Sequence, residues 1–190
     1  MTARDKHSAR LSLALWMVVL VCVSLGPALI ADGQGKINRE YKLKAVYLYR
    51  FGTYVTWPKG CFENNTSPFV IGILGPDHVG DDLRKIAEKK RIDGRKIKVI
   101  NFSQVKDVRR CQILFISRAV DAKEQQSAIN KLVKQNILFV GETPVFLKQK
   151  GVINFQIISN RVQIIISKSA YQREKLVISA QLLRIATIVK

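Results

Sequence analysis

The chain has 190 residues, of which 47% are hydrophobic and 24% are charged, as in ordinary folded globular proteins. This length supports one domain with a sizeable core and excludes two comfortable ones. The net charge of +18 is far from ordinary, and residues 1–31 contribute little of it. Such a charge usually suggests a nucleic-acid partner.

Residues 1–31 have the three parts of a secretory signal peptide. A basic start is followed by an apolar or small-residue core from Leu11 to Leu25, and Gly26 and Pro27 break this core ahead of Ala31. The core of about 15 residues is shorter than the about 20 that cross a bilayer. An uncleaved N-terminal anchor is the alternative. In both cases we expect the rest of the chain to lie outside the cytoplasm, in the periplasm.

Export changes the interpretation of the positive charge, because exported proteins rarely meet nucleic acid. The densest basic run, Glu88 to Lys98, also has no aromatic side chain to stack on a base. Acidic polysaccharide, an acidic protein or anionic lipid headgroups fit the compartment better. We therefore expect no nucleic-acid partner and at most weak contact with an anionic membrane surface. A solvated basic face without any partner is the alternative.

An amphipathic helix is expected to open the domain, from about Asn38 to Tyr54. Its apolar residues recur at helical spacing, and Trp57 with Pro58 should stop it, since proline lacks a backbone N–H and disfavours a preceding helical residue. Tyr49, Phe51 and Trp57 exceed the aromatic surface that one buried face needs. We expect this face to contribute to a dimer or partner contact, whereas simple core packing is the alternative.

Four short apolar runs, rich in β-branched residues and continuous, predict strands buried on both faces: Phe69 to Leu74, Ile97 to Phe102, Ile113 to Ile116 and Ile137 to Val140. Helical stripes fill two of the intervals, Val79 to Lys89 and Asp121 to Gln135. This alternation indicates an α/β fold, a mostly parallel sheet with helices on both faces. Residues 38–190 should form this single domain, after a disordered run at 32–37.

The C-terminal part has a different pattern. Two strand-like runs, Val152 to Ile158 and Val162 to Ile166, are separated by Ser159-Asn160-Arg161, which predicts an antiparallel β-hairpin with a tight turn. A broad apolar stripe from about Ser169 to Ile188 predicts a long C-terminal helix.

No catalytic device is recognisable in the sequence. His78 is the one histidine after the leader, and no cysteine or acidic cluster has metal-ligand spacing around it. Nucleophile-elbow, P-loop and dinucleotide-binding patterns are missing from the sequence. An acid–base pair of Asp77 with His78 is the alternative. We expect no enzyme, no cofactor and no metal.

In open α/β sheets, ligands bind in the crevice outside the carboxyl ends of the strands. Here Asp77, Arg118 and Glu142 follow predicted strands. Arg118 could hold a carboxylate or phosphate. The alternative is that these residues belong to ordinary polar connections.

Cys61 and Cys111 are the cysteines that follow the leader, so one intramolecular pairing exists. The expected topology places both near the amino ends of strands, and an oxidising compartment favours closure. A loop of about 50 residues would stabilise the fold by about 4 kcal/mol. Two free thiols, or a Cys111 buried as a small apolar residue, are the alternatives.

A series of motifs in fixed order resembles the YfiR/HmsC-like family. The matching segments are K-A-V-Y-L-Y-R-F with W-P in Lys44 to Pro58, I-G-I-L-G in Ile71 to Gly75, D-G-R-K-I-K-V in Asp93 to Val99, C-Q-I-L-F-I in Cys111 to Ile116, V-G-E in Val140 to Glu142, F-x-x-x-x-G-x-I-N-F in Phe146 to Phe155, and R-V-Q-I-I-I-S-K-S-A from Arg161. Asn154 and Arg161 stand in two of them and join the crevice candidates. One departure is Lys175, which replaces a glycine usual in the family.

The resemblance implies a periplasmic α/β protein that tends to form homodimers. Studied members bind the periplasmic part of an inner-membrane diguanylate cyclase and hold it inactive, which restrains cyclic-di-GMP signalling and biofilm formation. Others occur beside sensor kinases. The expected role is therefore an accessory regulator that represses an inner-membrane signalling protein by binding. The alternative is a periplasmic small-molecule binding or carrier protein that uses the crevice.

Overall fold

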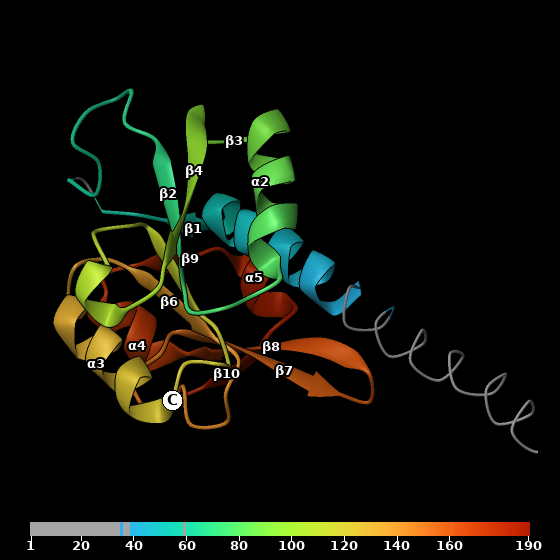
Figure 1. The fold of residues 1–190 in the computed structure, drawn as a ribbon. Helices are drawn as coiled ribbons and strands as arrows, with labels where there is room; N and C mark the ends of the chain where they lie inside the picture. The colour runs from blue at the N-terminus through green and yellow to red at the C-terminus, as the bar shows by residue number, and fades with distance from the viewer. Residues whose placement is uncertain (1–34, 36–38, 59) are drawn as a thin grey trace, which may run out of the picture. The chain divides into compact units, whose positions relative to one another are not determined.

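A mostly parallel sheet with helices on both faces organises the protein (Figure 1). The computed structural model describes residues 35, 39–58 and 60–190, and residues 40–190 form one compact unit. The predicted signal peptide lies outside the described residues. So does the predicted disordered run, apart from Gly35.

Among the described residues the sheet has eight strands in the order β10-β8-β7-β6-β5-β2-β4-β3. Its central strands β4, β2, β5, β6 and β7 are mutually parallel, whereas β3 and β8 are antiparallel to their inner neighbours and β10 is parallel to β8. The predicted mostly parallel sheet is therefore confirmed. The bounds are β2 Phe69–Leu74, β3 Arg91–Ile92, β4 Arg95–Phe102, β5 Ile113–Ile116, β6 Leu138–Gly141, β7 Ile153–Ile158, β8 Arg161–Ser167 and β10 Thr187–Val189.

Two helical crossovers place α2 (Val79–Lys89) and α3 (Ala122–Leu132) on opposite faces of the sheet. The connection from β2 through α2 to β4 steps in one direction, and that from β5 through α3 to β6 steps in the other. Because such connections are right-handed, opposite steps give opposite faces. Asp121 caps α3, since its side chain accepts hydrogen bonds from the backbone N–H groups of Lys123 and Glu124 at 2.8 and 2.9 Å. A short 3₁₀ turn, η1 (Val105–Asp107), precedes β5.

The N-terminal helix covers residues 39–54, close to the predicted range. Leu48 and Phe51 are fully buried. Phe51 stacks on Phe155 of β7 with ring centroids 5.7 Å apart, so this helix is fastened to the sheet by aromatic packing. The chain then forms the two-residue strand β1 (Val55–Thr56), which pairs antiparallel with β9 (Val177–Ile178).

The predicted β-hairpin is confirmed as β7 and β8, which pair antiparallel from Ile153 opposite Ile166 to Ile158 opposite Arg161. Ser159 and Asn160 make the turn with φ of 49° and 60°. Positive φ at both central residues gives the turn twist that matches paired strands.

The predicted C-terminal helix from Ser169 to Ile188 is wrong. The segment forms instead α4 (Lys168–Arg173), β9, α5 (Ala180–Arg184) and β10. Lys175 takes a φ of 55°, which ends α4, and Ser179 accepts a hydrogen bond from Leu182 N–H at 3.4 Å and restarts a helix as α5. The apolar residues that suggested one helical stripe include β-branched runs that pair as strands.

Candidate functional site

The strand order places a topological switch point at the carboxyl ends of β2 and β5. The connections that follow these two adjacent strands run in opposite directions along the sheet. Open α/β sheets bind their ligands at such a switch point. The segments after β2, β5 and β6 meet at this edge. Ser117 Oγ of the β5 segment, for example, donates a hydrogen bond to the Pro76 carbonyl of the β2 segment, 2.5 Å away.

Four charged side chains form a connected ion cluster at this edge: Glu40, Lys44, Arg118 and Glu142. Lys44 of the N-terminal helix has no exposed side-chain area, and its ammonium group donates hydrogen bonds to Glu40 and Glu142. Arg118 Nη2 lies 2.9 Å from Glu142 Oε2 and 2.5 Å from Glu40 Oε1. Two cations and two anions thus neutralise one another and tie the N-terminal helix to the ends of β5 and β6.

Tyr41 covers the cluster from the N-terminal helix. Its ring centroid is 4.8 Å from Lys44 Nζ and 5.9 Å from Arg118 Cζ, within the range of cation–π attraction. The His78 ring meets it edge-on at 5.2 Å. Burial, followed by the charge of Glu142, raises the pKa of Tyr41, so its phenol stays neutral near pH 7.

Glu142 is held as a carboxylate. Burial by itself would raise its pKa, but hydrogen bonds from Arg118 and Lys44 outweigh this effect, and the pKa lies below its ordinary value. The backbone N–H of Arg118 also donates to Glu142 Oε1 at 3.0 Å. In turn, the hydrogen bond with Glu142 raises the pKa of Arg118. Glu142 therefore stays ionised near pH 7 and remains paired with Arg118.

The structure pairs Arg118 directly with Glu142, whereas among the described residues no hydrogen bond or ion pair joins the other crevice candidates to these two side chains. Asp77 lies just before α2, where its side chain accepts hydrogen bonds from the backbone N–H groups of Val79 and Gly80, and burial raises its pKa. Asn154 is buried next to β6, opposite Gly141, and its Oδ1 has no hydrogen-bond partner. Arg161 is exposed at the hairpin turn, and no hydrogen bond or ion pair joins it to the cluster in the described part of the chain.

Three residues of this site were not predicted from the sequence: Glu40, Tyr41 and Lys44. A usable signal exists, because Lys44 stands inside the buried stripe formed by Ala45 and Leu48. A lysine in such a stripe needs a carboxylate partner, and Glu40 is four residues before it, on the same helix face. The second partner, Glu142, is 98 residues away and could not be identified from spacing.

The predicted aromatic contact surface needs a correction at Phe51, which is fully buried and packs on the sheet. Its hydrophobic side chain completes the core, so it cannot contact a partner. Tyr49 and Trp57 are partly buried. Trp57 meets Phe69 edge-on with centroids 4.9 Å apart, and its indole N–H has no hydrogen-bond partner.

Cys61 and Cys111 are buried free thiols in the structure. Their segments are adjacent, because the Gln112 side chain donates a hydrogen bond to the Cys61 carbonyl at 2.9 Å. Burial raises the pKa of both thiols, that of Cys111 to about 12. Their pairing as a disulfide stays a prediction.

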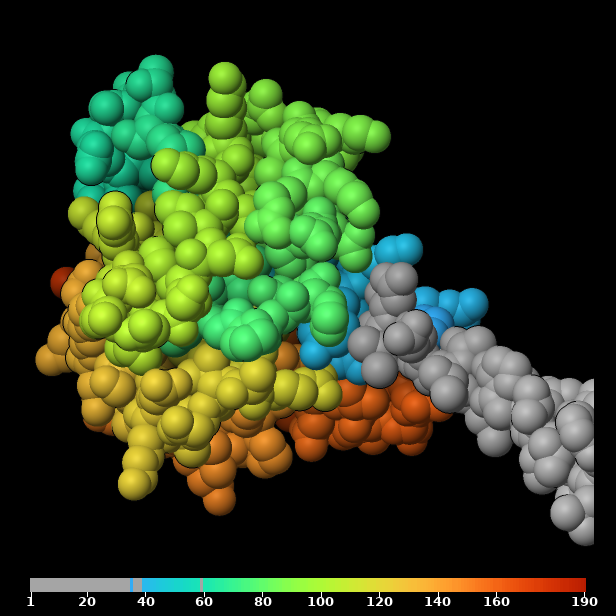
Figure 2. Space-filling model, in the orientation of Figure 1, coloured from blue at the N-terminus to red at the C-terminus, as the bar shows by residue number. Residues whose placement is uncertain are grey.

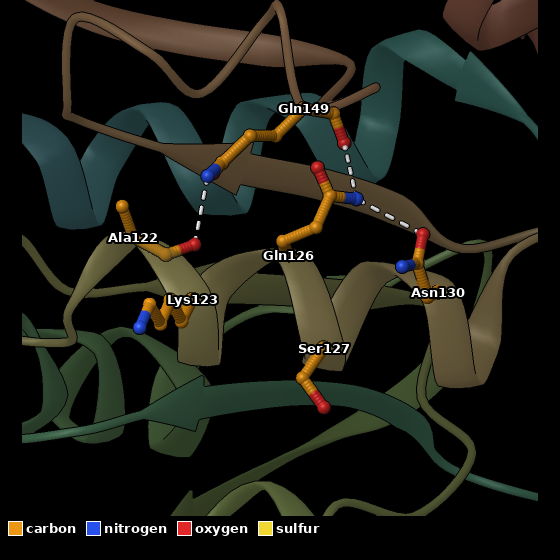
Figure 3. Close-up of a pocket in the computed structure, with 6 residues that line it drawn as sticks. All are labelled: Ala122, Lys123, Gln126, Ser127, Asn130 and Gln149. Atoms are coloured by element: carbon orange, nitrogen blue, oxygen red, sulfur yellow. Dashed lines mark hydrogen bonds between the residues drawn. The ribbon is translucent and has the colours of Figure 1, made fainter.

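A polar hollow of about 530 Å³ lies along the exposed side of α3 and is lined by Ala122, Lys123, Gln126, Ser127, Asn130 and Gln149 (Figure 3). Its amides are engaged with one another and with backbone carbonyls: Gln126 Nε2 donates to Asn130 Oδ1 at 2.9 Å, and Gln149 Nε2 donates to the Ala122 carbonyl at 2.7 Å. Lys123 is the one charged residue in its lining.

The described residues lack two further kinds of feature, a metal-binding group and a membrane-spanning helix. They contain no group of three or more His, Cys, Asp or Glu side chains that could hold a metal ion. They likewise contain no helix with the length and apolar character needed to cross a membrane.

The fold and site define a small α/β protein whose conspicuous polar feature is a self-neutralised ion cluster rather than a catalytic constellation. The YfiR/HmsC-like family, a domain of unknown function, matches residues 41–187, so the chain belongs to this family. That match confirms the resemblance seen in the sequence motifs. Family membership supports a periplasmic regulatory role in general.

Among solved structures, the chain is similar to a conserved domain protein from Vibrio cholerae o1 biovar eltor str. n16961, with 13% identity and a TM-score of 0.49 over 64% of this chain. It is also similar to the ABC domain in complex with L-Trp from Streptococcus pneumonia, with 8% identity and a TM-score of 0.46 over 63% of this chain. The chain spans 55% of the length of each of these two proteins. None of the curated proteins matches it.

Proposed function

We propose that this protein is a periplasmic accessory regulator that binds an inner-membrane signalling protein, such as a diguanylate cyclase or a sensor kinase, and represses it. The observation that carries the proposal is the family match over residues 41–187, which includes the N-terminal helix from Tyr41, strands β2 to β8 of the sheet and the hairpin. The protein acts by binding, without turnover and without a cofactor.

Repression follows from linkage. A module that binds the inactive state of its partner more tightly shifts the partner toward that state by the difference in the two binding free energies. Moving a partner from almost fully active to almost fully inactive takes an affinity ratio of about 10⁴. Such discrimination needs a rigid surface, and the ion cluster supports this requirement by fixing the N-terminal helix to the sheet edge.

The test is affinity capture of the full-length, C-terminally tagged protein from detergent-solubilised membranes of its native host. We expect an inner-membrane protein with a cytoplasmic cyclase or kinase domain to be enriched, and deletion of the regulator to raise that partner's activity. A matched control lacks residues 1–31 and should neither capture the partner nor restore repression, since it lacks the predicted leader. Unchanged partner activity after deletion would refute the proposal.

The carrier alternative has weaker support. A carrier would use charged groups in the crevice to hold its ligand, but Arg118 and Glu142 are engaged with each other and with the N-terminal helix. Asn154 Oδ1 is the one buried polar atom without a partner among the crevice candidates, and it favours a bound hydrogen-bond donor. Tight binding of a metabolite, lost in Asn154→Ala and combined with no membrane partner, would favour the carrier.

A further inference from the structure

A groove of about 310 Å³ lies between the N-terminal helix and α2. Val46, Tyr49 and Ile86 supply its apolar lining. Four cations complete the lining: Arg50, Lys85, Lys89 and Lys90. In Figure 2 the surface of α2 (green) adjoins that of the N-terminal helix (blue).

The apolar part of the groove belongs to an exposed stripe. Val46 is 42% exposed, and Leu43, three residues earlier on the same helix face, is 40% exposed. Tyr49 continues the stripe into the groove, so Leu43 to Tyr49 presents an apolar line about 9 Å long, at about 1.5 Å per residue. The buried face of this helix packs on the sheet, whereas this second apolar face stays partly exposed beside α2.

The cations of the groove are mostly without acidic partners. Lys85 lies 3.5 Å from Asp82, whereas Arg50, Lys89 and Lys90 form no ion pair with any described residue. The Arg50 guanidinium stays near the Tyr49 ring, 5.9 Å from its centroid. The groove thus combines an apolar lining with an uncompensated positive charge.

We infer that this groove docks an acidic amphipathic helix in the periplasmic part of the signalling partner. The inference rests on the proposed function and deepens it by naming the contact surface. A third helix can lay its apolar side between two helices while its carboxylates meet the flanking cations. The concave apolar lining suits such a rod better than a flat lipid surface.

The probe is a synthetic peptide of about 18 residues, or five helical turns, with leucine at i, i+3, i+4 and i+7 positions and glutamate beside them. We expect full-length protein to bind it in a fluorescence anisotropy titration and to bind a glutamine-substituted peptide roughly tenfold more weakly. Raising the ionic strength from about 0.05 to about 0.5 M should lower the affinity for the acidic peptide, because screening shortens the reach of exposed charges.

Charge reversal in Lys89→Glu/Lys90→Glu should lower the affinity for the acidic peptide roughly tenfold. The matched control is Lys123→Glu/Lys148→Glu, which reverses two exposed lysines away from the groove and should bind as the wild type does. Val46→Lys gives a second variant on an exposed position if the double reversal unfolds. Circular dichroism and thermal unfolding check that each variant is folded.

Equal affinity of the groove and control variants for the acidic peptide would overturn the inference. So would binding of the wild type to vesicles of phosphatidylglycerol and phosphatidylcholine without binding of the peptide, which would make the groove a lipid-facing surface. Membrane capture separates the two proposals. If the groove variant captures the partner as well as the wild type does, the docking inference fails and the regulator stands; if the wild type captures none, the regulator fails.

Discussion

Lys44 links the N-terminal helix to the sheet through buried ion pairs. Its ammonium group loses hydration on burial, and only hydrogen-bonded carboxylates compensate for this loss. Glu40 comes from one helical turn earlier and Glu142 from the end of β6. The cluster therefore attaches the N-terminal helix to the end of β6.

Replacing Lys44 with methionine should lower the free energy of unfolding by about 3 kcal/mol, because Glu142 would keep only Arg118 as a charged partner. Urea unfolding followed by circular dichroism measures the change. Lys42→Met, an exposed position on the same helix, is the matched control and should stay within about 0.5 kcal/mol of the wild type. A Lys44 variant as stable as this control would contradict the structural role of the cluster.

Cys111 should resist alkylation in the folded, reduced protein. Burial raises its pKa to about 12, so at pH 8 almost none of it is the reactive thiolate. Mass spectrometry after a short iodoacetamide pulse should show little modification in native buffer and full modification in urea. Rapid labelling of Cys111 in native buffer would contradict its burial. Omitting the reductant tests the predicted bridge, since a disulfide to Cys61 would block labelling in urea as well.

At the scale of elements, the C-terminal segment shows how one backbone position redirects a chain. Lys175 takes a left-handed φ of 55°, which an L side chain adopts at a cost and which glycine adopts freely. The turn there leads from α4 into β9, and β9 holds β1 at the end of the N-terminal helix. Two short helices and two short strands thus replace one long helix.

Lys175→Gly should raise the free energy of unfolding by about 0.5–1 kcal/mol, because relief of the left-handed conformation exceeds the added freedom of the unfolded chain. The thermal unfolding midpoint should shift upward by about 1–4 °C. The matched control, Lys168→Gly, lies in the exposed first turn of α4 and should be destabilising instead. A drop in stability for Lys175→Gly would show that the turn is not strained.

For the whole molecule, buried carboxylates and the net charge set the response of stability to acid. The folded pKa of Glu142 lies below its ordinary value near 4.5, so its stabilising contribution is complete above that value and is lost as pH falls through the folded pKa. Asp77 has the opposite slope, since its pKa is raised by burial. Protonation of carboxylates also adds to a charge that is already +18.

We therefore expect the wild type to lose stability as pH falls below about 4.5, and Glu142→Gln to start from a lower stability at pH 7 and lose less over the same interval. Chemical unfolding at a series of pH values gives the two slopes. Glu88→Gln removes an exposed carboxylate from α2 and should keep the wild-type slope. Equal slopes for Glu142→Gln and the wild type would exclude Glu142 as a source of acid sensitivity.

The sequence by itself determined the elements whose signals are local. The runs from Phe69 and Ile113 became β2 and β5, the stripe from Val79 became α2, and Ser159-Asn160 made the hairpin turn. Periodicity, continuous apolar runs and turn residues are properties of neighbours in the chain, and such signals survive without a structure.

Tertiary structure alone decided what depends on partners distant in the chain. The C-terminal stripe became strands because β8 and β1 offered unpaired edges to Thr187–Val189 and Val177–Ile178. Phe51 became core because Phe155 lies beneath it, and Lys44 found Glu142 at the end of β6. Strand pairing, aromatic packing and burial of charge each need a second group whose position no local pattern specifies.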